Sequence, residues 1–238
     1  MIILFILLLL FKSSETGKRM INGMLLPGFA FHKSKIGEMI VLNTIILWTR
    51  QVPQVLTALL EDGVYRCKEE YIRKKNDTIS DYYLELYRWY TREARKYREI
   101  APDAPYPIWL SVDEAMMLQP VENTVILKME IPVEKVLLCN NDAWGYRVNY
   151  WYVPVNAEDA DSHRAELALY GIHSDDELIN THKGNFYPHL RKKIEKSWSR
   201  VFTQMNVGND MLVATTWELR KEWIREVRIY EALDVTES

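Results

Sequence analysis

Polar side chains at the ends of three predicted strands are the residues of this sequence best placed to do chemistry. Arg50 closes one short apolar run, Ser111 closes another, and Glu218 lies near the end of a third. A guanidinium group binds phosphate oxygens as a fork of donors, and a carboxylate stabilises positive charge that develops in a reaction. Sites in sheets flanked by helices tend to form at strand ends. We therefore predict a site that contains Arg50, Ser111 and Glu218.

Aromatic residues are the second feature that bears on function. The 238 residues include 8 Trp and 14 Tyr, and five of these lie within 140–154, Trp144 among them. Such side chains either fill a core or line a pocket for a flat ligand. Both interpretations stay open at this point.

The sequence lacks the residue patterns that are typical of several other kinds of functional site. The histidines do not show a metal-binding spacing such as HExxH, so no metal site is expected. No GxSxG elbow, phosphate-binding P-loop or GxGxxG motif is present. Cys67 and Cys139 are isolated, which argues against a disulfide scaffold and favours a reducing cytosol. Cys139 could be a nucleophile beside His163, but a buried structural cysteine is the simpler interpretation.

Basic residues recur along a predicted helix over 78–98, where Arg88, Arg92 and Arg95 share one face. Basic side chains interleaved with aromatic ones suit a groove for single-stranded nucleic acid. The alternative is a solvated face with pairs such as Glu85 and Arg88. The net charge of -3 provides no general attraction for nucleic acid. A second basic cluster, Arg191, Lys192, Lys193 and Lys196, is interpreted as a solubilising surface.

The hydrophobic pattern predicts an α+β fold, a single domain with a small mixed or antiparallel sheet flanked by helices and a helix-rich C-terminal third. Alternating or short apolar runs predict the strands, and apolar residues at helical spacing predict the helices. The region 222–230 fits a strand or a short helix. Ser111 to Glu114 has the pattern of a helix capping box. The predicted strands cover 45–51, 64–67, 108–111, 124–131, 136–139 and 212–219, and the predicted helices cover 53–61, 69–75, 78–98, 157–170 and 187–202.

The ends of the chain differ in pattern from the rest. We predict that residues 1–40 form a poorly patterned N-terminal extension, which an over-long gene start would explain. Residues 41–232 are predicted to form a single globular domain, and residues 233–238 a tail. The apolar run 1–11 is shorter than the roughly 20 residues that span a bilayer as a helix. We therefore expect no membrane anchor and a cytoplasmic location, with an oligomeric state that the pattern does not indicate.

Four runs of residues carry a family resemblance: ILWTRQ at 46–51, KEEYI at 68–72, YPIWLS at 106–111 and WELRKEW at 217–223. They resemble the uncharacterised bacterial family known as domain of unknown function 3841. The resemblance extends over nearly all of 42–230, and it implies no activity.

The order of a strand with arginine, a strand with serine and a late strand with glutamate more distantly resembles the ADP-ribosyltransferase fold. This resemblance implies that Arg50 binds the diphosphate of NAD, Ser111 supports the nicotinamide ribose, and Glu218 stabilises the charge that develops as nicotinamide leaves. It also implies that Tyr106, Trp109 or Trp144 stacks on nicotinamide or adenine.

The acceptor stays open between nucleic acid, protein and a small molecule. Thr216 stands where that fold has a second acidic residue, which argues against protein arginine as the acceptor. The rival hypothesis is a binding module without enzymatic activity, which would hold nucleic acid or a protein partner through the basic helix and the aromatic segment 140–154.

Overall fold

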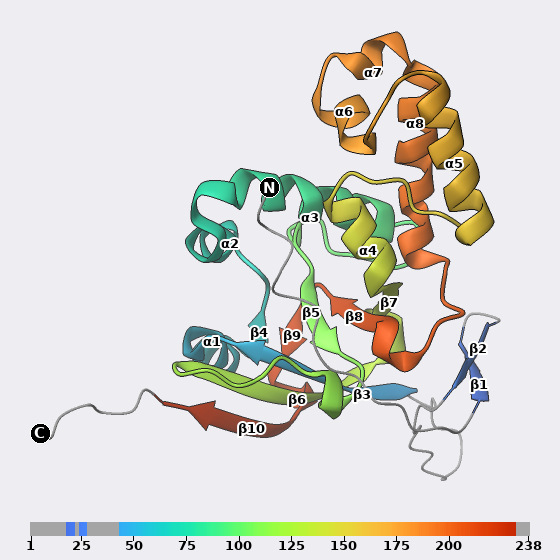
Figure 1. Cartoon of the computed structure of the whole chain (residues 1–238). Helices are drawn as coiled ribbons and strands as arrows, with labels where there is room; N and C mark the ends of the chain where they lie inside the picture. The colour runs from blue at the N-terminus through green and yellow to red at the C-terminus, as the bar shows by residue number, and fades with distance from the viewer. Residues whose placement is uncertain (1–17, 22–23, 28–42, 232–238) are drawn as a thin grey trace, which may run out of the picture.

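One antiparallel sheet of six strands organises the chain in the computed structural model, which describes residues 18–21, 24–27 and 43–231 (Figure 1). The strand order is β10-β6-β3-β5-β8-β7, and every neighbouring pair is antiparallel. A second sheet pairs β4 with β9. The strands of the two sheets are β3 (Thr44–Gln51), β4 (Val64–Tyr65), β5 (Ile108–Ser111), β6 (Thr124–Pro132), β7 (Leu137–Asn140), β8 (Leu212–Thr216), β9 (Leu219–Arg220) and β10 (Ile224–Tyr230).

Helices cover the two faces of the large sheet and add a separate lobe. They are α1 (Pro53–Asp62), α2 (Glu69–Asn76), α3 (Ser80–Ala94), α4 (Asn141–Val148), α5 (Ala157–Leu169), α6 (Asp175–Asn180), α7 (Lys183–Phe186) and α8 (Pro188–Ser197). Helices α5 to α8 form the lobe that stands away from the sheet at the top of Figure 1. This confirms the predicted α+β fold and its helix-rich C-terminal third.

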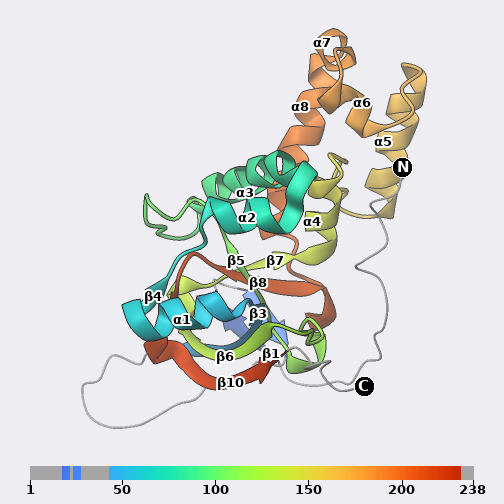
Figure 2. The same ribbon diagram turned by 90° about the vertical axis from the view of Figure 1, so that its left-hand side faces the viewer.

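The side chains of β5, β7 and β8 alternate between two cores, because successive residues of a strand point to opposite faces, whereas β3 and β6 contribute to one of these cores only. On one face, Leu47 and Leu127 pack with Val55 and Leu59 of α1. On the other, Cys139 and its neighbours on β5, β7 and β8 pack beneath α3, α4 and α8. Figure 2 shows α3 and α4 on the opposite side of the strands from α1. The sheet therefore separates two helical layers.

The first helix follows directly from the local sequence. Pro53 occupies its first turn, where the missing N–H costs nothing. Gly63 ends it with a φ of 77°, a left-handed conformation that glycine adopts without strain, and its N–H donates to the Leu59 carbonyl. Both predicted ends of this helix are confirmed to within one residue.

Other predicted boundaries need correction. The helix predicted over 78–98 is regular only as α3, because the chain tightens to three-residue hydrogen bonds from Glu93 and Ala94 onward. Ser111 does not cap a helix. It is a strand residue whose hydroxyl donates to the Met116 carbonyl, and Asp113 is the cap instead.

The C-terminal third shows similar differences. The aromatic segment 140–154 contains α4, which the sequence pattern did not predict because aromatic residues obscure its period. Helix α8 ends at Ser197 and continues as a 3₁₀ helix over Trp198–Phe202. In the ambiguous region 222–230, a 3₁₀ helix over Lys221–Trp223 leads into strand β10, which pairs with β6.

Two short strands, β1 (Lys18–Ile21) and β2 (Met24–Pro27), pair with each other inside the predicted N-terminal extension. The other residues of 1–40, and the tail 233–238, lie outside the described residues.

Candidate functional site

Arg50, Trp109 and Ser111 lie together on one face of the sheet. Trp48 of β3 is directly opposite Ser111 of β5, and the Thr49 hydroxyl donates to the Trp109 carbonyl over 2.9 Å. Trp48 and Ser111 are the one ladder pair between β3 and β5 among the described residues, and extending their antiparallel register by two residues aligns Arg50 with Trp109. Side chains that are opposite in such a pair share a face. Trp48, Arg50, Trp109 and Ser111 thus form a two-by-two set, which we call the β3–β5 patch.

The guanidinium of Arg50 is half-buried and has no carboxylate partner within the part of the chain that the structure describes. Its Nη1 donates to the Gln119 carbonyl in the connection between β5 and β6. A carbonyl satisfies one of five N–H donors and leaves the positive charge unpaired. The remaining donors can bind an anionic group such as a phosphate.

Aromatic rings border the β3–β5 patch on the side of α3 and α4. The rings of Trp109 and Trp144 are 5.2 Å apart, and Tyr87 of α3 is nearly parallel to Trp144 at 6.4 Å. All three side chains are half-buried. Burial raises the pKa of the Tyr87 hydroxyl well above its ordinary value, so it remains a neutral donor. The structure therefore places Trp144 next to Trp109 of the patch, although the two residues are 35 positions apart in the sequence.

Trp48 is a member of the patch that is not among the predicted site residues. Its indole Nε1 is buried and has no acceptor within the described residues, and the ammonium group of Lys128 lies 5.7 Å from its ring centre. A buried donor without a partner is uncommon in folded proteins. The sequence carries a weak signal for it, because Trp48 is two residues from Arg50 on the same strand and must share its face.

Glu218 lies apart from the β3–β5 patch. Thr215 is opposite Trp109 in the sheet, and Glu218 follows three residues later, past the end of β8. Its carboxylate accepts hydrogen bonds from Arg66 at 3.0 Å and from Arg220 at 2.9 Å. Burial opposes its ionisation, but the hydrogen bonds from Arg220 and Arg66 outweigh burial and lower the pKa of the Glu218 carboxyl.

A hollow of about 50 Å³ borders this carboxylate, with Arg66, Arg98 and Lys135 among the residues around it. That volume holds a water molecule and little more. Arg66 also pairs with Asp103 at 2.8 Å. The contacts of Glu218 are those of an ion-paired network that ties β4 to β9.

Tyr106 is buried beneath α2 and α3 and does not reach the β3–β5 patch. Its hydroxyl donates to Glu69 over 2.7 Å and accepts from Arg88 over 3.1 Å. Burial and the hydrogen bond to Glu69 raise the pKa of this hydroxyl. Arg88 also pairs with Glu69 at 2.9 Å. The expected pair of Arg88 with Glu85 does not form, because Glu85 pairs with Arg147.

Cys139 and His163 do not meet. Cys139 is buried under α3, where burial raises the pKa of its thiol to about 12. His163 lies in the lobe and pairs with Asp175 at 2.6 Å. Over 18–21, 24–27 and 43–231, no group of three or more His, Cys, Asp or Glu side chains is arranged to hold a metal ion.

The chain belongs to the family described as a domain of unknown function, DUF3841, whose family model matches residues 46–225. The matched range runs from β3 to the start of β10 and includes the β3–β5 patch and Glu218. No curated protein and no solved structure matches the chain. Among the described residues, no helix has the length and apolar character needed to cross a membrane.

Proposed function

We propose that this protein is an ADP-ribosyltransferase-like enzyme that binds NAD along the β3–β5 patch. The observation that supports the proposal is the order β3-β5-β8 in the sheet, because these three neighbouring strands carry or lead into Arg50, Ser111 and Glu218. Two further observations add to this support: Arg50 has no carboxylate partner among the described residues, and the rings of Trp109 and Trp144 lie 5.2 Å apart on the neighbouring β5 and on α4.

Each group has a distinct task in the proposed reaction. Arg50 binds the diphosphate, because its free N–H donors match phosphate oxygens. Trp109 and Trp144 offer ring surface to nicotinamide or adenine. The bond between the ribose C1′ and the nicotinamide nitrogen breaks, and the electron pair leaves with nicotinamide. The acceptor then bonds to C1′ and releases its proton.

Glu218 stabilises the positive charge that develops on the ribose in this step. Only the ionised carboxylate can do so, and Arg66 and Arg220 favour that form. Because the carboxylate is paired with both arginines, the proposal requires that bound NAD draw Glu218 out of at least one of these contacts.

The experiment is calorimetric titration of the full chain with NAD, followed by an assay for free nicotinamide. Arg50→Ala should weaken binding about 10- to 100-fold, the value of a charge-assisted hydrogen bond. Glu218→Gln should leave binding within about threefold and abolish nicotinamide release, because the proposed contact of this carboxylate is with the charge of the transition state and not with the diphosphate or the rings of bound NAD.

Arg92→Ala is the matched control, since Arg92 is an exposed arginine on α3 with no partner among the described residues. It should behave as the unaltered protein does. A folded chain that binds no NAD, or binds it equally well after Arg50→Ala, would rule the proposal out.

A further inference from the structure

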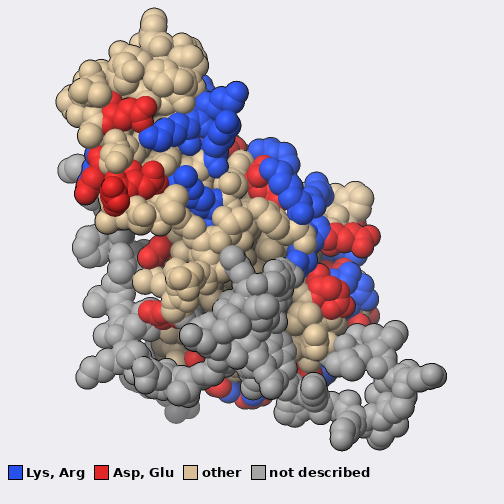
Figure 3. Space-filling view, turned by 90° about the vertical axis from the view of Figure 1, so that its right-hand side faces the viewer, with Lys and Arg blue, Asp and Glu red and all other residues tan. Residues whose placement is uncertain are grey.

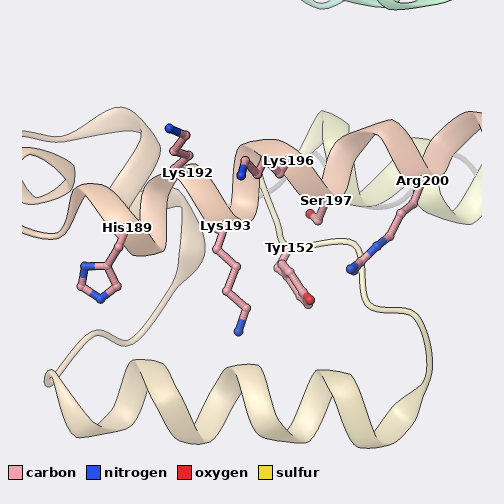
Figure 4. A pocket seen from close by; sticks show the side chains of 7 residues that line it. All are labelled: Tyr152, His189, Lys192, Lys193, Lys196, Ser197 and Arg200. Carbon is pink, nitrogen blue, oxygen red and sulfur yellow. The ribbon is translucent and has the colours of Figure 1, made fainter.

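A groove of about 480 Å³ lies along α8 in the lobe, far along the chain from the β3–β5 patch (Figure 4). No aspartate or glutamate of the described chain lines it. The side chains of His189 and Lys193 extend from α8 toward α5, and Arg200 does so at the other end. The residues that line it include Tyr152, His189, Lys192, Lys193, Lys196 and Arg200.

Two of the cations are neutralised inside the lobe. Lys193 pairs with Glu166 at 2.5 Å, and Arg200 lies 3.4 Å from Asp159. Both also lie over the ring of Tyr152, at 5.3 Å and 5.2 Å from its centre. These contacts fix the positions of Lys193 and Arg200 at the base of the groove, and the ion pairs offset the positive charge there.

Lys192 and Lys196 provide the positive charge of the groove that no carboxylate of the described residues neutralises. Both are exposed, and neither ammonium group has an ion pair or hydrogen bond to any described residue. They are one helical turn apart on α8, a rise of about 6 Å. Figure 3 shows lysine and arginine side chains gathered on this face of the lobe. The surface therefore attracts an anion that has more than one charged group.

Exposed aromatic rings lie at the α7 end of the groove. The ring of Tyr170 is 45% exposed and 5.7 Å from His189, which lines the groove. Tyr187 is 5.3 Å from Tyr170, and Phe186 is 73% exposed. An exposed ring next to a basic groove is a platform on which a base can stack.

We propose that this groove binds single-stranded nucleic acid, with backbone phosphates on Lys192 and Lys196 and bases on Tyr170 and its aromatic neighbours. The basic side chains from His189 to Arg200 extend over about 16 Å of helix, and the rings lie beyond one end. That span exceeds one nucleotide and suits several. This binding does not require NAD, so the proposal can be tested independently of the proposed enzyme activity.

The test is fluorescence anisotropy of the full chain with short labelled single-stranded DNA and RNA, without NAD, over a range of salt concentrations. Affinity should fall linearly on a log–log plot against salt. The double variant Lys192→Ala/Lys196→Ala should bind about tenfold more weakly, with a salt slope shallower by about 1.4, from about 0.7 per phosphate contact. Tyr170→Ala should weaken binding about tenfold with an unchanged salt slope.

Lys74→Ala/Lys75→Ala removes the same charge from exposed positions on α2 and is the matched control. It should leave the affinity within about twofold of the original. Three results would each overturn the proposal: no binding by the unaltered protein, an equal loss in the α2 control, or competition by inorganic polyphosphate as strong as that by the oligonucleotide. Circular dichroism of each variant separates these results from misfolding.

Discussion

Arg147 of α4 offers a test of how the core of this protein is stabilised. Its side chain is 1% exposed, and its guanidinium carbon lies 4.0 Å from the ring centre of Trp198, 4.6 Å from Trp89 and 5.1 Å from Tyr150. Only Nη2 has a partner among the described residues, Glu85 at 3.2 Å, while Nε and Nη1 are buried without an acceptor. Burial lowers the pKa of Arg147.

The unfavourable contributions of this charge are at least as large as the favourable ones. Three desolvated cation–π contacts contribute about 1–2 kcal/mol each. Against them stand a desolvation penalty of several kcal/mol for the buried ion and about 1–3 kcal/mol for each unpaired N–H. The bond to Glu85 adds little, because the Glu85 side chain is 53% exposed and screened by water. The packing of Arg147 should therefore matter more than its charge.

Two substitutions separate packing from charge. Arg147→Met keeps a long side chain against the rings and removes the buried ion, so the free energy of unfolding should stay within about 1.5 kcal/mol. Arg147→Ala opens a cavity beneath three rings and should cost about 3 kcal/mol. For a domain of this size, that loss lowers Tm by about 6–12 °C.

Thermal and urea unfolding followed by circular dichroism would measure both variants. A methionine variant as unstable as the alanine variant would refute the reasoning, because it would mean that the charge itself holds the core together. An alanine variant as stable as the original would show that Arg147 is not buried among these rings.

The remaining predictions concern buried polar groups. The pKa of Glu218 is lower in the folded chain than its ordinary 4.5, so its ion pairs stabilise the fold above that pH and lose this contribution as pH falls through the folded value. The stability difference between Glu218→Gln and the original should therefore shrink below about pH 4.5 in urea unfolding series, and a constant difference would contradict it. Trp217→Phe removes the buried 2.8 Å hydrogen bond to Thr91 and should cost about 1–3 kcal/mol in the same assay; an unchanged unfolding midpoint would show that this bond contributes nothing. Burial raises the pKa of Cys139 to about 12, so iodoacetamide at pH 8 should modify it only after unfolding, and mass spectrometry that finds early modification would show that the site opens in the folded protein.

Local patterns were sufficient for much of the fold. The apolar run of β3, the proline in the first turn of α1 and the glycine after it act within about a dozen residues, and their effects do not depend on the rest of the chain. The aromatic density of 140–154 concealed α4, because the large side chains lie on both faces of that helix. The period of 222–230 suited two structures, and pairing of β10 with β6 decided between them.

Only part of the candidate site could be predicted from the sequence. Strand ends indicated Arg50, Ser111 and Glu218, but the register that joins Arg50 to Trp109 depends on hydrogen bonds between strands nearly 60 residues apart. Long-range contacts also pair Glu218 with Arg66 and Tyr106 with Glu69. No local pattern reports which charged residue will meet which partner.

The sequence by itself determined most of the elements, including β3 and α1, and the family, because these depend on side-chain type and short-range spacing. Tertiary structure alone decided which charges are neutralised. Lys193 and Lys196 look alike in the sequence, yet Glu166 of α5 pairs with the first and leaves the second exposed. Because charge pairing depends on how whole helices pack, the basic groove on α8 emerges only once the lobe has folded.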